Sequence, residues 1–189
     1  MVSMIQNVDW SILNFIQQHL RCGLLDSLMP FITNLGNLGA IWIFTAMLLM
    51  LMKKHRRCGV TVLLGIAAGF VIGNLMLKPL IARPRPCMLD TAMPLLIPAE
   101  TDFSMPSGHM LAAVIAAALL TWEDKRFGWV MIPLAALMGF SRLYLYQHFP
   151  SDIMAALALG LLIAWITRMI VKRAYPLLAR RFRSSPADA

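Results

Sequence analysis

Three short clusters of polar residues interrupt the chain, and their side chains are of the types that bind and attack phosphate groups. Lysine and arginine are the usual ligands of phosphoryl oxygens, and two histidines can supply a nucleophile and a general acid. The clusters are Lys78-Pro79-Leu80-Ile81-Ala82-Arg83-Pro84-Arg85-Pro86, Pro106-Ser107-Gly108-His109, and Ser141-Arg142 with His148 and Asp152. We therefore expect phosphate chemistry where the fold brings these clusters together.

The second and third clusters have spacings that suit such a site. Ser107-Gly108 precedes an apolar run, and a helix that begins there would offer free backbone N–H groups and the positive end of its dipole to an anion. Gly108 would let a ligand approach the backbone closely. Asp152 lies four residues after His148. At that spacing it could hold the imidazole in the tautomer whose attacking nitrogen is unprotonated.

Several of these residues also have a simpler interpretation. Lys78, Arg83 and Arg85 could be interfacial anchors that reach lipid headgroups. Ser107 could be only a helix N-cap, and Asp152 could be a first-turn acid favoured by the helix dipole. All of these alternatives would have to hold together on one face of the molecule, so we favour a functional site.

The sequence argues against a catalytic metal, and we predict no cofactor. It contains no His-Glu-x-x-His motif and no acidic cluster near the histidines. The surplus of arginine and lysine would also repel a cation. Arg142 lies inside an otherwise apolar run, where an isolated charge is costly and usually functional. Anion binding is therefore the expected role of the cations.

The elements that position these clusters must lie in a membrane. The chain has 189 residues, of which 59% are hydrophobic and 14% charged, and its mean hydropathy is +0.70. A soluble domain is about 45–50% apolar and about 25% charged. The net charge of +8 would suggest nucleic acid in a soluble protein. Here we expect no nucleic-acid partner and attribute the charge to the positive-inside pattern and to anionic lipids.

Hydropathy predicts an all-α, polytopic membrane helix bundle that forms one domain over residues 1–189. A span takes about 20 residues. The five expected spans are Leu28–Met52, Gly59–Leu77, Gly108–Trp122, Phe127–Leu145 and Ile153–Ile170. Pro30, Gly36 and Gly39 are expected to break or kink the first span. A glycine every four residues, at Gly65, Gly69 and Gly73, should allow close helix contact in the second.

Two parts of the chain are less constrained by hydropathy. The first 20 residues are expected to form an interfacial amphipathic helix, or a sixth span if they cross. Its two faces would carry Val8, Ile12, Phe15, Ile16 and Leu20 on one side, and Asp9, Gln17 and Gln18 on the other. Cys22, Cys58 and Cys87 form neither a zinc spacing nor a disulfide framework, and the N-terminus lacks the basic region of a cleaved signal peptide.

The basic residues orient the bundle. Twelve of the 17 lysines and arginines lie between spans one and two, between spans three and four, or after span five, where residues 172–189 form a basic tail. With five spans these three places share one side, which the positive-inside rule makes cytoplasmic. The three polar clusters share the opposite face. We therefore expect the site at the extracytoplasmic surface of the inner or plasma membrane.

The three clusters together resemble the signature of the type 2 phosphatidic acid phosphatase family. Its first part is Lys, six residues, then Arg-Pro, as in Lys78 and Arg85-Pro86. Its second part is Pro-Ser-Gly-His, and its third is Ser-Arg, five residues, His, three residues, Asp. All three parts match in order and spacing, and the resemblance covers residues 59–170.

This resemblance implies a metal-independent membrane phosphatase that acts on lipid phosphates or diphosphates through a phosphohistidine intermediate. His148 would be the nucleophile, Asp152 its orienting residue and His109 the general acid for the leaving oxygen. The residues that would bind phosphoryl oxygens are Lys78, Arg85, Ser107, Gly108 and Arg142. Arg83 lies outside the strict signature.

The substrate is less sharply defined. Small bacterial members of the family include undecaprenyl diphosphate phosphatases, which makes undecaprenyl diphosphate the expected substrate. Some of these carry Pro-Ser-Asp-His where this chain has Pro-Ser-Gly-His, so phosphatidic acid and phosphatidylglycerol phosphate stay open. A non-enzymatic carrier of an anionic lipid or phosphate could use the same cations, but anion binding alone does not require two histidines and an aspartate. The oligomeric state is not predicted.

Overall fold

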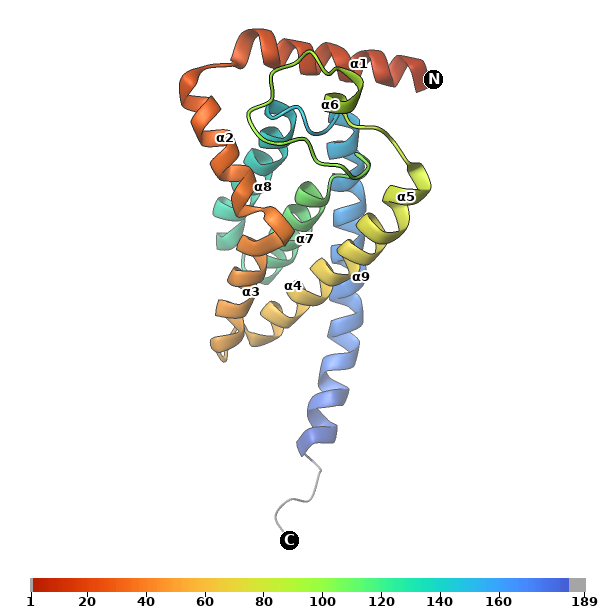
Figure 1. Cartoon of the computed structure of the whole chain (residues 1–189). Helices are drawn as coiled ribbons and strands as arrows, with labels where there is room; N and C mark the ends of the chain where they lie inside the picture. The colour runs from red at the N-terminus through yellow and green to blue at the C-terminus, as the bar shows by residue number, and fades with distance from the viewer. Residues whose placement is uncertain (1, 184–189) are drawn as a thin grey trace.

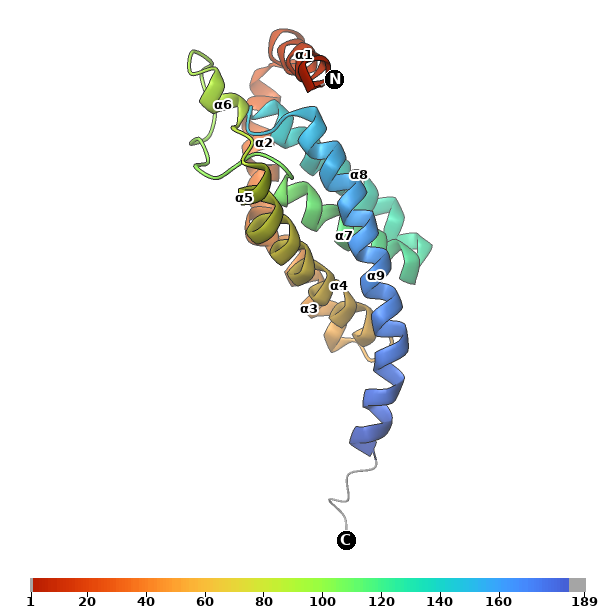
Figure 2. The ribbon, with the colours of Figure 1, turned by 90° about the vertical axis from the view of Figure 1, so that its right-hand side faces the viewer.

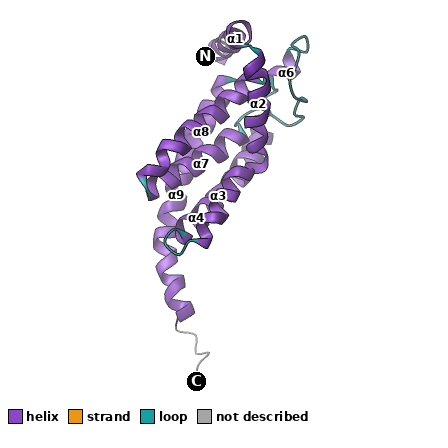
Figure 3. Cartoon of the chain, turned by 90° about the vertical axis from the view of Figure 1, so that its left-hand side faces the viewer, coloured by secondary structure: helices purple, strands orange, loops and turns teal. Residues whose placement is uncertain are grey.

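The computed structural model describes residues 2–183, and every regular element in this range is a helix (Figure 3). In chain order the helices are α1 (Val2–Phe15), η1 (Ile16–Leu20), α2 (Gly23–Leu35), η2 (Asn37–Gly39), α3 (Ala40–Leu51), α4 (Arg56–Gly69), η3 (Phe70–Leu77), α5 (Lys78–Ile81), α6 (Pro86–Leu89), α7 (Gly108–Glu123), α8 (Lys125–Tyr144) and α9 (Pro150–Arg183). The all-α prediction is confirmed.

Three segments among the described residues are long and apolar enough to cross a membrane, namely Arg56–Leu89, Lys125–Tyr144 and Pro150–Tyr175. Helices α2 and α3 make a fourth if this pair, bent by 48°, counts as one span. Helix α7 is apolar but has only 16 residues, or about 24 Å, against a hydrocarbon core of about 30 Å. The chain is therefore a helical membrane protein with three or four candidate spans, and the count of five stays a prediction.

The bend between α2 and α3 lies where glycines were expected to interrupt the first span. Leu38 (φ 53°) and Gly39 (φ 74°) both adopt left-handed backbone, which an α-helix cannot contain. Pro30, by contrast, lies inside α2 without ending it, so the break comes from the glycine segment and a kink at Pro30 stays a prediction. Membrane helices tolerate such a proline when neighbouring groups satisfy the freed carbonyl. The break places Asn37 within hydrogen-bond distance of His109.

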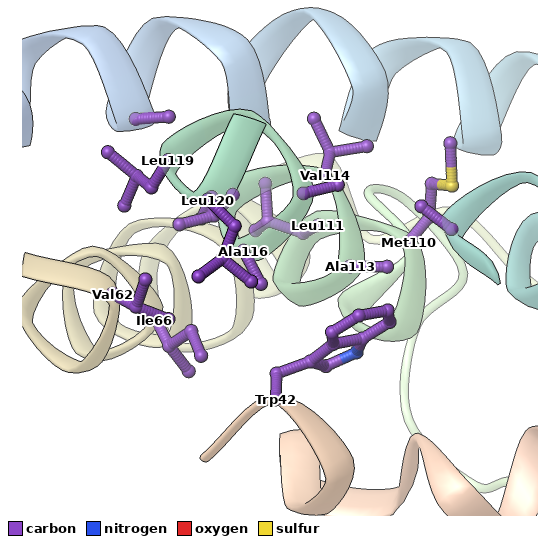
Figure 4. Close-up of a cluster of buried hydrophobic side chains, with 14 of the residues drawn as sticks. Trp42, Val62, Ile66, Met110, Leu111, Ala113, Val114, Ala116, Leu119 and Leu120 are labelled. Atoms are coloured by element: carbon purple, nitrogen blue, oxygen red, sulfur yellow. The ribbon is translucent and has the colours of Figure 1, made fainter. Parts of the chain in front are cut away.

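Helix α7 is the centre of the bundle. It packs against α4, α8 and α9, and its side chains are buried on all sides (Figure 4). A Cβ atom at Gly65 or Gly69 would lie 2.8 or 2.6 Å from side-chain atoms of Ile115 on α7, so only glycine allows this approach. The predicted close contact of the glycine stripe is confirmed. The packing fixes the position of Gly108 and His109 at the start of α7.

Helix α1 lies across one end of the bundle, above the helices that run through it (Figures 1 and 2). Its apolar residues Val8, Ile12 and Phe15 are exposed, whereas Asp9 is 2% exposed. Asp9 is docked on the protein through its ion pair with Arg83, but Gln18 of the predicted polar face is exposed and Ile16 of the predicted apolar face is buried. The predicted division into two faces is thus only partly reproduced, and the outward-facing Val8, Ile12 and Phe15 suit a helix that lies in a membrane interface.

Helix α9 is longer than the span expected from hydropathy. It projects beyond the other helices (Figure 2) and continues to Arg183. The segment expected to be a basic tail, residues 172–189, is therefore helical as far as residue 183, and residues 184–189 lie outside the described part. Helix α4 likewise begins at Arg56 rather than Gly59, and α2 begins at Gly23 rather than Leu28.

Candidate active site

One cavity of about 430 Å³ contains groups from all three polar clusters. Residues of the clusters that line it are Lys78, Gly108, His109 and His148. Arg85 joins them through a 3.1 Å contact between its Nη1 and His148 Nε2. Arg142 joins them through an ion pair with Glu100, which also lines the cavity. The fold thus brings together groups that are as much as 70 residues apart in the sequence.

The turn between α8 and α9, residues 145–149, holds His148 in a buried position. Every residue of this turn is at most 1% exposed. The chain reverses direction at Tyr146, whose backbone is left-handed (φ 60°), a conformation that is rare outside glycine and often found at functional sites. The backbone N–H of Gln147 donates to the carbonyl of Arg142 at 3.1 Å. The histidine is therefore held by backbone geometry as well as by side chains.

The contacts of His148 define its tautomer. A guanidinium group can only donate hydrogen bonds, so Nε2 of His148 accepts from Arg85. The proton of the neutral ring then lies on Nδ1, which faces Asp152 Oδ2 at 3.6 Å. Nδ1 is buried and has no closer hydrogen-bond partner among the described residues. Nε2, the nitrogen that carries the lone pair, faces Arg85.

Charges around His148 favour its neutral form. Burial lowers the pKa of His148 well below its ordinary value of 6.5, and the positive charges of Arg85, Arg142 and Lys78 lower it further. Glu100 opposes this effect. A neutral imidazole is the form that can act as a nucleophile.

Asp152 is fully buried and is held by more groups than its histidine alone. Its Oδ1 accepts from Arg83 Nη1 at 2.5 Å. Its Oδ2 accepts from the backbone N–H of Phe149 at 2.8 Å and from the hydroxyl of Ser104. These donors satisfy the hydrogen-bonding capacity of the buried carboxylate. It is positioned to orient the Nδ1 side of His148.

Three cations of the predicted phosphate site lie together, and two of them are completely buried. Arg85 and Arg142 are 0% exposed and Lys78 is 6% exposed. Arg142 Nη1 donates to Thr33 Oγ1 at 2.7 Å, which fixes the guanidinium against α2. Its Nε is buried and has no partner among the described residues. Buried charges of one sign are costly unless anions compensate them, so this group is built to hold negative charge.

The anions that compensate these cations are Glu100 and Asp102, which the sequence analysis did not identify. Glu100 pairs with Arg85 at 2.6 Å and with Arg142 at 2.5 Å. Asp102 pairs with Arg85 at 2.5 Å and also with Lys78. The sequence shows no acidic cluster near the histidines, and it is the path of the loop that brings these two carboxylates to the cations. Both residues come from the loop of residues 90–107, which has no periodic pattern or motif that would have revealed them.

Both carboxylates are ionised at neutral pH. Burial alone would raise the pKa of Glu100, but Arg142 and Arg85 outweigh it and hold that pKa below its ordinary value. Burial also opposes ionisation of Asp102, whose pKa is nevertheless lowered to about 2 by its hydrogen bond with Lys78 and by the charges of Arg85 and Lys78. The three cations and two carboxylates therefore form one charged network.

The start of α7 contributes the second histidine. The Nε2 atom of His109 lies 3.0 Å from Asn37 Oδ1 in the break between α2 and α3. Asn37 Nδ2 donates to Asn34 Oδ1 at 3.2 Å, which directs its oxygen toward the imidazole. Ser107 is completely buried and its Oγ accepts from the backbone N–H of Met110 at 3.5 Å. The N-cap interpretation of Ser107 thus has a structural basis, and phosphate binding by Ser107 stays a prediction.

Arg83, which the signature does not include, links α1 to the start of α9. Its Nη1 donates to Asp152 and to Ser151 Oγ at 2.7 Å, and its Nη2 donates to Asp9 at 2.7 Å. The backbone N–H of Ser151 donates to Asp9 Oδ1 at 2.9 Å. The guanidinium also lies 4.2 Å from the ring centroid of Phe149. Arg83 is therefore a partly buried bridge rather than a lipid anchor.

Comparison with known proteins identifies the family. Residues 58–176 match the PAP2 superfamily, which is more than half of the chain, and the residues of all three clusters lie within this range. The chain belongs to the PAP2 superfamily. The family prediction made from the spacing of the clusters is confirmed.

Individual relatives support the same class. The chain is 30% identical to the undecaprenyl-diphosphatase of Sulfolobus acidocaldarius, over 88% of this chain and 80% of that protein. It is 31% identical to the undecaprenyl-diphosphatase BcrC of Bacillus subtilis, over 75% of this chain and 72% of that protein. The structure of a transmembrane PAP2-type phosphatidylglycerolphosphate phosphatase from Bacillus subtilis superimposes with a TM-score of 0.73 at 26% identity, covering 90% of this chain and 87% of that one. The chain is a membrane phosphatase of this family.

Proposed function

We propose that this phosphatase hydrolyses the terminal phosphate of a lipid diphosphate, with undecaprenyl diphosphate as the substrate. The observation that carries the proposal is the cavity, which is polar at one end and apolar at the other. Beyond the charged groups it is lined by Ile43, Leu63, Ile66 and Phe70. An amphiphile with an anionic head and a hydrocarbon chain fits both parts. The names of the two similar undecaprenyl-diphosphatases support this choice of lipid.

The cavity also supports lateral entry of the substrate from the membrane. Leu38 and Phe70 line the cavity and are themselves 91% and 49% exposed. The cavity therefore reaches the outer surface of the bundle beside the break between α2 and α3. A lipid can keep its headgroup at the interface while its chain passes between these residues. The sequence similarity to a phosphatidylglycerolphosphate phosphatase structure keeps that phospholipid as the second candidate.

The reaction we propose has two steps at His148. Nε2 of His148 attacks the terminal phosphorus, the bond from phosphorus to the bridging oxygen breaks, and His109 donates a proton to that oxygen as the lipid monophosphate leaves. Water then attacks the phosphohistidine and gives its proton to His109, which releases inorganic phosphate and restores both histidines. Arg85, Arg142 and Lys78 stabilise the charge on the phosphoryl oxygens in both steps. Asp152 stabilises the positive charge that develops on His148.

The roles of the remaining predicted residues follow from their places. Gly108, at the N-terminus of α7, offers backbone N–H groups to the phosphoryl oxygens. Ser107 adds a hydroxyl to the same helix start. No step of this route uses a metal or a cofactor, because side chains supply the nucleophile, the acid and the cations.

The arrangement in the membrane is part of the proposal. We assign five spans to a single domain, with α2 and α3 together as one bent span. Helix α1 lies along the membrane interface. The twelve basic residues of the connecting segments and of α9 then face the cytoplasm, and the site opens on the other side of the inner or plasma membrane. The substrate would be met in the outer leaflet.

Sidedness is tested with single cysteines at Thr91 and Lys54 in a cysteine-free background. Both positions are exposed, and they lie on opposite sides in the proposed arrangement. A membrane-impermeant thiol reagent added to intact cells should label position 91 and spare position 54. The reverse pattern would invert the topology and remove the outer-leaflet substrate.

The activity is tested by phosphate release in detergent micelles. Purified protein should release inorganic phosphate from undecaprenyl diphosphate faster than from phosphatidylglycerol phosphate or phosphatidic acid. His148→Ala should abolish release, and His19→Ala, an exposed histidine on η1, should leave it unchanged. Faster release from either phospholipid would overturn the choice of lipid, and full activity of His148→Ala would overturn the mechanism.

A further inference from the structure

The phosphate site already contains two bound anionic groups, and both belong to the protein. Glu100 spans the two buried guanidinium groups with separate oxygens, Oε2 on Arg85 and Oε1 on Arg142. Asp102 likewise uses Oδ1 for Arg85 and Oδ2 for Lys78. Four carboxylate oxygens thus make the contacts with arginine and lysine that phosphoryl oxygens make in phosphate complexes. No other carboxylate among the described residues pairs with these three cations.

The carboxylates differ from the cations in how deeply they are held. The side chains of Arg85 and Arg142 are at most 1% exposed, whereas those of Glu100 and Asp102 are 33% and 52% exposed. Both carboxylates line the cavity that the substrate must enter. They therefore lie on its open side, where they have space to move away once a phosphoryl group takes their place on the cations.

The backbone of the loop is anchored independently of these side chains. The N–H of Ser104 donates to the carbonyl of Arg83 at 2.8 Å, and Arg85 Nε donates to the carbonyl of Asp102 at 2.8 Å. The N–H of Glu100 donates to Gln147 Oε1 at 3.3 Å. A change of side-chain rotamer alone would release the cations while the loop stays in place. Exchange of carboxylate for phosphate thus requires no large movement of the chain.

We propose that Glu100 and Asp102 are specificity-determining residues that compete with phosphate for Arg85, Arg142 and Lys78. The phosphoryl group of the substrate displaces the carboxylates, and they return when inorganic phosphate leaves. Three buried cations alone would retain the released phosphate strongly, because burial strengthens their attraction for it. The carboxylates weaken this product complex, whereas a lipid substrate gains additional binding from its chain in the apolar part of the cavity.

The relative weight of the two residues follows from their contacts. Glu100 is the less exposed of the two and pairs with both arginines. Asp102 is half-exposed and pairs with one arginine and with Lys78. Exposed ion pairs are screened by water and contribute less than buried ones. Loss of the Glu100 charge should therefore have the larger effect.

The test measures binding of inorganic phosphate without turnover. Purified full-length protein carrying His148→Ala is titrated with phosphate in detergent by calorimetry, with and without Glu100→Gln or Asp102→Asn. We expect Glu100→Gln to lower the Kd for phosphate about tenfold, equal to about 1.4 kcal/mol, and Asp102→Asn to lower it by a smaller factor. The matched control is Glu123→Gln, a partly exposed glutamate beside His55, which should leave the Kd unchanged.

The outcomes separate this inference, which rests on the proposed function, from that function itself. An unchanged or higher Kd in both Glu100→Gln and Asp102→Asn would overturn the inference, whatever the enzyme hydrolyses. Tighter phosphate binding by Glu100→Gln in a protein that hydrolyses no lipid phosphate would support the competition and overturn the proposed function. With the native His148, Glu100→Gln should also show stronger inhibition by added phosphate, again by about tenfold.

Discussion

The α8–α9 turn and the 90–107 loop meet at the same cations but are built in opposite ways. All five residues of the turn are buried, and backbone hydrogen bonds fix His148 within it. The loop places two partly exposed carboxylates at the mouth of the cavity. The difference indicates a division of labour, in which the attacking group is fixed in advance and the anion-binding groups are released by exchange.

Arg85 is the residue that joins the two regions, so its removal should have the largest effect. It contacts His148 Nε2 and the carbonyl of Gln147 on the turn, and the carbonyl of Asp102 on the loop. Arg85→Gln removes the charge and most of these donors. We expect kcat for the lipid diphosphate to fall about 10²–10³-fold, as when one donor to a transition-state oxyanion is lost.

Assays of Arg85→Gln should include a folding control, because buried acceptors lose their partner. Size-exclusion chromatography and helical circular dichroism of the purified variant would show whether the bundle is intact. Lys125→Gln, at the start of α8 on the other side of the bundle, serves as the matched charge control. A folded Arg85→Gln enzyme with near-normal kcat would show that the two regions do not depend on this bridge.

Arg142→Lys tests whether the geometry or only the charge of the cation that pairs with Glu100 of the loop matters. The guanidinium uses Nη1 for Thr33 and Nη2 for Glu100, which leaves its planar edge in a fixed orientation. A lysine keeps the charge but offers a single ammonium group. We expect kcat/KM to fall about tenfold, or about 1.4 kcal/mol. Unchanged kcat/KM would mean that charge alone is required at this position.

Asp9→Asn tests how far the turn depends on α1. Asp9 accepts from Arg83 and from the start of α9, and Arg83 holds Asp152 behind the nucleophile. Loss of the charge should weaken this support and lower kcat about fivefold, or about 1 kcal/mol, with little change in KM. Asp124→Asn is the matched control, because Asn caps a helix as well as Asp does. A change in KM alone would place the effect of Asp9 on substrate binding instead.

The sequence was informative about the turn and much less so about the loop. His148, Asp152 and Arg142 stand at fixed spacings within apolar surroundings, so their types and positions could be recognised before the fold was known. Glu100 and Asp102 lie in an irregular segment, where neither helical period nor motif says which side chains meet the cations. Only the three-dimensional path of the loop brings them there.

Contacts between distant parts of the chain explain the other differences. Asp9 pairs with Arg83 across 74 residues, and a helical pattern in the first 20 residues cannot reveal that this side chain is docked on the protein. The small residues at Gly36 and Gly39 did indicate where α2 ends. Pro30 does not end α2, since a membrane helix tolerates proline when a neighbouring group satisfies the freed carbonyl.

The smallest expected effect concerns the protonation of His148, which lies in the α8–α9 turn. The pKa of His148 is lowered by burial first and by Arg85, Arg142 and Lys78 next, so the ring should stay neutral on both sides of pH 6.5. Nuclear magnetic resonance of protein with labelled histidine rings, with His148→Ala to assign the signal, should show no titration of His148 between about pH 5.5 and pH 8. Titration near pH 6.5 would mean that the cations do not act on this histidine as the geometry requires.

The most direct test of the mechanism is to trap the phosphoryl group on the enzyme. Purified protein is mixed with undecaprenyl diphosphate labelled in the terminal phosphate, quenched within one turnover, and analysed by peptide mapping. His109→Ala is included because loss of the acid should slow the chemistry enough to follow it. We expect a base-stable, acid-labile phosphoryl group on His148 and none in His148→Ala. A label on any other residue, or full turnover without a labelled protein, would contradict nucleophilic attack by His148.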